Sequence, residues 1–525
     1  MDNLPQELIN RIVWFAERYP GQDKWYPAIE QSFGLTESPS QFPRLANLNH
    51  LWKEAVETIT FRHLVIKSDE LDTFQSIVTG NRRKYLAKIS FTVLLPEYSY
   101  EACACVESRD EQRLNDEAFT KGICDLFAIL KAREDDGVQS ALQLDLNTAA
   151  SPTDYRIHGL KRNELMSDIA IGKRKDILSD RWENSRLHYL KPDILPVLSN
   201  VQHFKIDGNG SRRLVPRIAP DLTMSLPNLK NVEWEFLDCD AQSADESSDE
   251  DSLESDSDSE PEPDNGTATS PKVRSANRVA FADALRKIRS RSRSSAQITF
   301  YHKSPTDQRR TCPSIVPLGL TYDPFSAALR TFSQNLTALT LSAHFDSTLF
   351  WPSPDEENTV VPTWPHLKLL DVTFNMVTPC GDWYFTGPRP ADHEHDDVER
   401  GIIGDSEREY SYWNYRVHPD PETFDPFLAA FAKAVAKMPV LEYFMLESEL
   451  MGTTGRLHIS YHAPGKKAQW GDEGPKDLRR RRVYYACEVG KVWVPEPETA
   501  ESLRGAGSEK FGGEVIERFL GSQYY

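Results

Sequence analysis

One spacing of apolar residues recurs along this 525-residue chain and limits its fold more than any other feature. Written with ϕ for an apolar residue, the spacing is ϕxxϕxxϕxϕ. The final ϕxϕ is typical of a short strand whose alternate side chains face inward, and the preceding ϕxxϕ turns the chain into that strand. The copies are Leu198/Val201/Phe204/Ile206, Leu226/Leu229/Val232/Trp234, Trp364/Leu367/Leu370/Val372 and Met438/Leu441/Phe444/Leu446, with Ser333/Leu336/Leu339/Leu341 and a degenerate Val138/Ala141/Leu144/Leu146.

Stacked units of this kind build a parallel sheet over a continuous core, which is the leucine-rich-repeat solution. The first positions of the five better copies lie 28, 107, 31 and 74 residues apart, so the repeat is irregular. A helix is predicted from Phe424 to Met438, because its apolar residues follow helical spacing and Pro439 stops it before the next strand. Any α/β protein contains some such strings, but this number of matches favours an irregular leucine-rich-repeat-like solenoid of the α/β class.

The charge of the chain is concentrated in one segment. Residues 245–264 hold eleven Asp or Glu and no Lys or Arg, so −11 of the formal charge of −19 lies there and −8 is left elsewhere. The mild acidity of the remainder does not favour nucleic acid or an anionic membrane as a partner. Five cations follow between Arg286 and Arg293. Because neither tract can bury enough apolar surface to offset its ordering entropy, we predict a disordered insertion over 238–315, with a short helix over 279–288.

Two interpretations of this insertion are open. It is either a solvated spacer or a regulatory segment. The second interpretation rests on serines that stand three positions before an acidic residue, as acidophilic kinases favour, and on a basic run that suits nuclear import. These serines are Ser247, Ser248, Ser255, Ser257 and Ser259.

The first 67 residues predict two helices separated by a Pro- and Gly-containing segment. Pro5 suits the first position of a helix over residues 4–16, since the N–H that it lacks has no partner there. A second helix is predicted over 42–59. Two short helices form too small a core to be stable alone, so we expect them to pack on a partner chain or on the rest of the protein.

These helices carry a resemblance to a known family. Leu4-Pro5-x-Glu7-Leu8-x-x-x-Ile12, followed by Leu45-x-x-Leu48-Asn49-x-x-Trp52, resembles an F-box, the helical module that docks on the Skp adaptor of cullin–RING ubiquitin ligases. Residues 61–83, 363–372 and 378–385 are similar to fungal F-box proteins with an irregular repeat region. The segment between the two helices, residues 19–41, is longer than the family usually has.

The resemblance implies a set of partner-binding residues that face the Skp-type adaptor or form the F-box core, with Leu48 and Trp52 expected to be core. The alternative is that all of them pack onto residues 68–237, in a non-catalytic repeat-protein scaffold without ligase association. The set is Leu4, Pro5, Leu8, Ile9, Ile12, Leu45, Leu48 and Trp52.

Motifs for catalysis are weak in this sequence, which contains no phosphate-binding loop, nucleophile elbow or H-E-x-x-H motif. Cys103, Cys105 and Cys124 lack a fourth ligand at a fitting spacing. His393 and His395 form the most metal-like cluster, but they stand in a charged, Pro-rich stretch that is typical of a solvated turn. A metal-dependent enzyme at this pair is the third class of function considered, and we predict no catalytic residue, no metal and no cofactor.

Aromatic side chains between the repeats are better functional candidates. They are equally suited to an interface and to closing a core that the irregular repeats leave open. These residues are Trp383, Tyr384, Phe385, Tyr410, Tyr412, Trp413 and Tyr415.

Four regions are predicted: an F-box-like helical module at 1–67, α/β repeats at 68–237, the disordered insertion at 238–315 and further repeats at 316–525. The predicted function is the substrate-recognition adaptor of an SCF-type ubiquitin ligase, which holds a client protein on its repeats. The chain has no apolar run long enough to span a membrane, no N-terminal signal peptide and seven Cys, so we expect an intracellular protein of the cytoplasm or nucleus.

Overall fold

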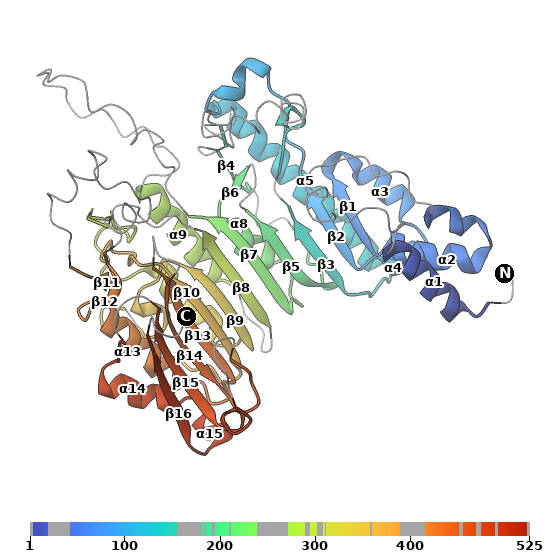
Figure 1. Ribbon diagram of the computed structural model, residues 1–525. Coiled ribbons are helices and arrows are strands. Elements are labelled where there is room, and N and C mark those ends of the chain that lie inside the picture. Colours follow the sequence, from blue (N-terminus) through green and yellow to red (C-terminus); the bar gives the residue numbers. More distant parts are fainter. Residues whose placement is uncertain are drawn as a thin grey trace, which may run out of the picture.

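The computed structural model describes residues 4–18, 42–147, 149–154, 181–182, 185–190, 195–208, 212–238, 271–288, 294–301, 308–309, 311–356, 360–388, 415–450, 455–468, 474–488 and 492–521. These residues form a mixed α/β fold around one curved, twelve-stranded sheet that runs from edge strand β1 to edge strand β16 (Figure 1). The strands are β1 (His63–Lys67), β2 (Lys88–Thr92), β3 (Leu142–Leu146), β5 (Val201–Asp207), β7 (Asn231–Leu237), β8 (Ser295–Tyr301), β9 (Ala338–Ala343), β10 (Leu369–Phe374), β13 (Tyr443–Glu449), β14 (Arg456–His462), β15 (Arg481–Cys487) and β16 (Val515–Leu520). Two short pairs lie outside it: β4 (Arg186–Leu187) with β6 (Arg213–Leu214), and β11 (Phe385–Thr386) with β12 (His418–Pro419).

The strands of the sheet follow one another in sequence order. From β1 to β13 all neighbours are parallel. Only β14 is antiparallel to both of its neighbours, and β15 and β16 are again parallel. A sheet ordered in this way grows by adding one strand and one connection at a time.

The register aligns the predicted ϕxϕ residues across the sheet. All six predicted strand segments are confirmed as strands, and their apolar positions pair directly with those of their neighbours. Two columns result, and their side chains join one core. One column is Leu64, Ile89, Leu144, Phe204, Val232, Ala296, Leu339, Leu370 and Phe444, and the other is Ile66, Phe91, Leu146, Ile206, Trp234, Ile298, Leu341, Val372 and Leu446.

Helices in the connections pack their apolar faces on these columns. Trp234, which is fully buried, has the ring of Phe281 at 6.0 Å and the ring of Phe332 at 6.1 Å between centroids. Helices α1 (Gln6–Arg18) and α2 (His50–Thr60) instead pack in a separate cluster. The other described helices are α3 (Leu71–Ile77), α4 (Arg82–Tyr85), α5 (Arg109–Asp135), α8 (Ile218–Thr223), α9 (Pro271–Leu285), α10 (Pro324–Ser333), α13 (Phe424–Val435), α14 (Pro497–Arg504) and α15 (Ser508–Phe511), with the 3-10 turns η2 (Phe42–Asn47), η3 (Ser68–Glu70), η4 (Tyr100–Ala104), η6 (Ser347–Leu349) and η7 (Asp477–Arg479). The predicted helix after Phe424 is confirmed as α13.

The opposite face of the sheet is polar. Between the apolar columns stand side chains such as Lys205, Glu233 and Thr340, which are only partly buried. Lys205 pairs with Glu233 and, at 3.1 Å, with Glu235 on the neighbouring strand. These contacts pair opposite charges on adjacent strands.

The predicted disordered insertion over 238–315 is wrong in part, whereas the short helix predicted over 279–288 is confirmed in part, because α9 covers 279–285. Helix α9 occupies 271–285, and β8 occupies 295–301 in the middle of the sheet, between β7 and β9. Composition was misleading because β8 lies among Ser and Arg residues, yet its inward side chains Ala296, Ile298 and Phe300 are all buried. The acidic tract at 245–264 lies outside the described residues.

The boundary predicted after residue 67 also changes. Strand β1 lies inside the predicted 1–67 module, but it pairs with β2 and belongs to the sheet, so the helical part ends with α2. No helix among the described ranges is both long enough and apolar enough to cross a membrane.

Candidate functional site

The N-terminal helices form a small core of their own. Ile9 and Val13 of α1 pack with Trp52, Ala55 and Val56 of α2, in a cluster separate from the main core. The N-terminus of α2 is capped by Asn49, whose side-chain oxygen accepts hydrogen bonds from the backbone N–H groups of Leu51 (2.9 Å) and Trp52 (3.2 Å). Helix α1 packs against both η2 and α2, so the two predicted helices do meet.

The structure divides the eight predicted partner-binding residues by exposure, and four of them, Leu4, Ile9, Leu45 and Trp52, belong to the small core of the helical pair. Ile9 and Trp52 are buried, and Leu4 and Leu45 are partly buried. Pro5, Leu8, Ile12 and Leu48 are exposed, and we call these four the N-terminal apolar patch. Leu8 is 46% exposed, Ile12 43% and Leu48 49%.

One expectation within this set is wrong. Leu48 was predicted to be a core position, but it lies in the turn between η2 and α2, one residue before the cap, and half of it is exposed. Helical spacing does not apply in that turn, so the apolar pattern could not reveal which side Leu48 faces. Segment 19–41, which joins the two helices, lies outside the described residues.

The helical pair is attached to the first strands by polar contacts. Arg82 of α4 pairs with Glu57 of α2 at 2.8 Å, and the hydroxyl of Tyr85 donates to Glu54 at 3.2 Å. Burial, and then the charge of Glu54, raise the pKa of Tyr85, so this hydroxyl stays protonated as a donor. These contacts fix α2 against the sheet while the N-terminal apolar patch remains open.

The other candidate residues from the sequence, the aromatic side chains and the histidine pair, either lie in or near the core or fall outside the described residues. Trp383, Tyr384 and Phe385 are buried, and Tyr384 packs on Phe427 of α13 with 4.8 Å between ring centroids. This first aromatic group therefore closes the core. Tyr415 is partly exposed, and its hydroxyl donates to the backbone oxygen of Gln308 at 3.1 Å. The remaining three aromatic candidates, at 410, 412 and 413, and the histidines at 393 and 395 lie outside the described residues.

The three cysteines have separate surroundings. Cys103 is buried beside Tyr98 and Trp182, Cys105 is exposed, and the sulfur of Cys124 lies 3.7 Å from the hydroxyl of Tyr189. Within the described ranges, no group of three or more His, Cys, Asp or Glu side chains is arranged to hold a metal ion.

Sequence reasoning missed a groove between η6 and α13. It has a volume of about 650 Å³ and is lined by aromatic, hydroxyl and carboxyl groups, among them Trp351, Phe427, Thr378, Asp346 and Asp382. Its residues come from five separate stretches of the chain, so no sequence motif marks it. The only local signal is the cap pattern of Asp346 followed by Ser and Thr, which indicates a turn and not a site.

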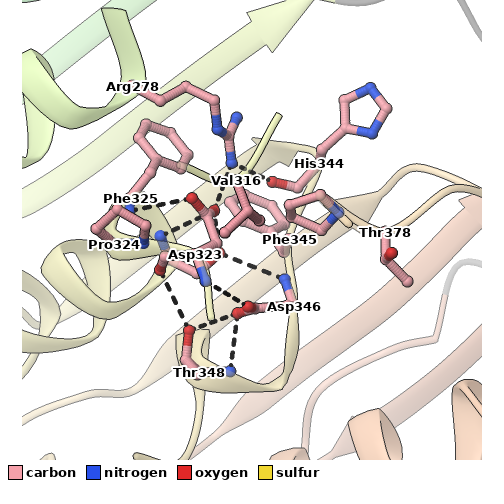
Figure 2. Close-up of polar contacts among 12 residues, drawn as sticks. Arg278, Val316, Asp323, Pro324, Phe325, His344, Phe345, Asp346, Thr348 and Thr378 are labelled. Atoms are coloured by element: carbon pink, nitrogen blue, oxygen red, sulfur yellow. Dashed lines mark hydrogen bonds and ion pairs between the residues drawn. The ribbon is translucent and has the colours of Figure 1, made fainter. Parts of the chain in front are cut away.

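A buried network of charges includes Arg278 and Asp323, which Figure 2 shows beside the groove residue Asp346. Arg278 of α9 is 1% exposed, and its guanidinium pairs with Asp238 at 3.2 Å and with Asp323 at 2.5 Å. Arg274 pairs with the same Asp238 at 3.1 Å. The two arginines hold the pKa of Asp238 far below its usual range, despite its burial. The network joins the end of β7 to α9 and to the start of α10.

Asp346 stands next to this network, on the groove side. One of its oxygens accepts from the backbone N–H of Asp323 at 2.7 Å, and the other accepts from the N–H of Thr348 at 3.0 Å and from the Thr348 hydroxyl. Burial and the neighbouring charge of Asp323 raise the pKa of Asp346 to about 6. The hydrogen bonds described for this carboxylate thus come from uncharged donors alone.

Comparison with known proteins adds no identification. No family model matches this chain, and no curated protein is similar enough to count as a relative.

Proposed function

We propose that this protein is the substrate-recognition adaptor of an SCF-type cullin–RING ubiquitin ligase. In this proposal α1 and α2 are an F-box that docks on a Skp-type adaptor, and the sheet with its helices is an irregular leucine-rich-repeat region that holds a client protein. Ubiquitin transfer belongs to the partner subunits, and this chain makes and breaks no covalent bond.

The observation that carries the proposal is the N-terminal apolar patch. Three large apolar side chains of a two-helix module are each about half exposed, although the same helices bury Ile9 and Trp52 against each other. A module this small has little apolar surface to spare, and Leu8 and Ile12 stand one turn apart on the same helix. Neighbouring exposed apolar residues are typical of a protein-binding site. The resemblance of these same residues to an F-box supplies the kind of partner.

The arrangement of the sheet supports the second half of the proposal. Eight consecutive parallel pairings, in sequence order and with aligned apolar columns, are what stacked repeats produce. The repeats also differ in length, and helix α5 alone contains 27 residues. In this proposal the irregular connections supply the surface that holds the client.

The test is complex formation with a recombinant Skp-type adaptor. The full chain is expected to elute with the adaptor as a one-to-one complex in size-exclusion chromatography. Leu8→Asp is expected to abolish the complex, because it places a charge in the contact. Val65→Asp is the matched control, since Val65 is a 69% exposed apolar residue on β1, outside the patch. If the wild-type chain forms no complex, or if both variants behave alike, the proposal is wrong and the scaffold alternative remains.

A further inference from the structure

The groove between η6 and α13 combines an apolar wall with two carboxylates, those of Asp346 and Asp382. Trp351, Phe427 and Ala430 supply apolar surface, and Val361, which also lines the groove, is 55% exposed. A volume of about 650 Å³ lies within the range of specific ligand sites and holds two or three side chains. The groove is formed by elements of the C-terminal half, whereas the N-terminal apolar patch lies on α1 and the turn before α2.

The ion pairs near the groove explain why the Asp346 carboxylate keeps its negative charge available to a ligand. Arg274 and Arg278 pair with Asp238 and Asp323, as described above. A third buried arginine, Arg330, donates to the backbone oxygen of Thr348 and pairs with Glu356 at 2.5 Å. All hydrogen bonds described for the Asp346 carboxylate come from uncharged donors, two backbone N–H groups and one hydroxyl. Asp382, which also lines the groove, adds a second carboxylate. The raised pKa of Asp346 is consistent with a carboxylate that lacks a cationic partner.

A cation that binds in the groove would therefore gain more interaction energy from Asp346 than a second cation would gain from a carboxylate at an exposed surface. Charge-assisted hydrogen bonds to a partly desolvated carboxylate are stronger than those in bulk water. Among the described residues that line the groove, Lys433 is the only cation, and it is itself exposed to solvent on α13. A ligand with an apolar part and one positive charge fits both the wall and the carboxylates.

We propose that this groove binds a short segment of a partner protein through a lysine or arginine side chain that pairs with Asp346, with a neighbouring apolar side chain on Trp351 and Phe427. This inference deepens the proposed function, on which it rests, because it names the chemistry of the client that the adaptor selects. The binding itself needs neither the Skp-type adaptor nor the ligase.

The experiment measures peptide binding to the purified full chain by fluorescence anisotropy. Two labelled pools of nine-residue peptides are compared, each with a fixed leucine after the central position. The central residue is lysine or arginine in one pool and glutamine in the other. The cationic pool is expected to bind at least tenfold more tightly than the glutamine pool.

Substitutions then locate the binding site. Val361→Lys places a competing cation in the groove and is expected to weaken binding of the cationic pool at least fivefold, whereas Lys433→Ala removes a repelling charge and is expected to strengthen it. Val360→Lys is the matched control, because Val360 is 84% exposed and does not line the groove. Asp346→Asn, checked for folding by its thermal midpoint, is expected to remove the preference for the cationic pool.

Two outcomes overturn the inference: equal binding of the two pools, including no binding of either, or equal effects of Val361→Lys and Val360→Lys. Neither outcome bears on docking to the Skp-type adaptor, because Val361→Lys is expected to leave that complex unchanged. Conversely, tight binding of the cationic pool without a complex with the Skp-type adaptor would overturn the proposed function while leaving the groove as a peptide site.

Discussion

Replacing two residues of the N-terminal apolar patch, Leu8→Lys with Leu48→Lys, separates docking from folding. Leu8 is 46% exposed and Leu48 is 49% exposed. Burying a whole Leu side chain contributes about 1.5–3 kcal/mol, so covering the open half contributes about 1 kcal/mol for each residue. The loss of about 2 kcal/mol corresponds to roughly a 30-fold weaker Kd for the Skp-type adaptor, since about 1.4 kcal/mol is tenfold. Desolvation of the two unpaired ammonium groups adds to this loss.

The fold is expected to tolerate the same change. The methylene stem of a lysine covers the half of each site that is buried, while its ammonium group remains in water. Ile9→Ala is the contrasting variant, because Ile9 is fully buried in the core of the helical pair. Its truncation is expected to cost about 2–5 kcal/mol and to melt the pair.

Isothermal titration calorimetry with the adaptor, together with thermal melts of each variant, distinguishes these effects. The double lysine variant is expected to keep the wild-type midpoint and to lose binding, whereas Ile9→Ala loses both. The reasoning is refuted if the double lysine variant, folded as the wild type, binds the adaptor with unchanged affinity. The patch would then have no part in docking.

Three further predictions concern the folded body. Arg278→Met leaves two buried carboxylates without their shared partner and should lower the free energy of unfolding in urea by about 3–5 kcal/mol; an unchanged midpoint would contradict the buried network. Trp234→Ala opens a cavity between α9 and α10 and should cost about 3–5 kcal/mol by the same measurement, so a loss below 1 kcal/mol would refute this packing. Burial and the charge of Glu447 raise the pKa of Asp371 to about 6, above its usual 3.8, so the folded state favours the protonated form and stability falls as pH rises from about 4 to 6. Asp371→Asn should therefore flatten that part of the stability profile and raise stability at pH 7.5 by about 1–2 kcal/mol, and a profile with the same slope would rule this out.

The strands that the sequence predicted correctly share one property. Their ϕxϕ residues face a core on one side and solvent on the other, so burial and pattern coincide along a few residues of chain. Strand β8 also contains the final ϕxϕ part of the pattern, at Ala296 and Ile298. The two earlier apolar positions of the pattern, however, fall on Ser290 and Arg293. Its place in the sheet depends on pairing with β7 and β9, which lie far away in sequence. Non-local pairing of this kind outweighed a local composition that favoured disorder.

The N-terminal candidates show the same limit. The spacing of the apolar residues predicted that they share one face of α1. It could not predict that Ile9 is buried whereas Leu8 and Ile12 are half exposed. That division depends on where α2 crosses α1, which is decided by contacts between residues about 45 positions apart, such as Gln6 with the backbone oxygen of Leu51. The resemblance to an F-box named the set of residues, and only packing distinguished the members that a partner can reach.

The sequence alone determined where the ϕxϕ strands lie and that they stack in parallel. Alternating apolar residues specify each strand, and their recurrence along the chain specifies the stack. Both signals depend on residues within one turn or one strand of each other. The tertiary structure alone decided which residues of the folded chain a binding partner can reach. The N-terminal apolar patch arises where two helices meet, and the groove beside Asp346 arises where five stretches of chain converge. Arg278 and Asp323 form their ion pair only when folding removes both from water, and among the described residues only uncharged donors then reach Asp346.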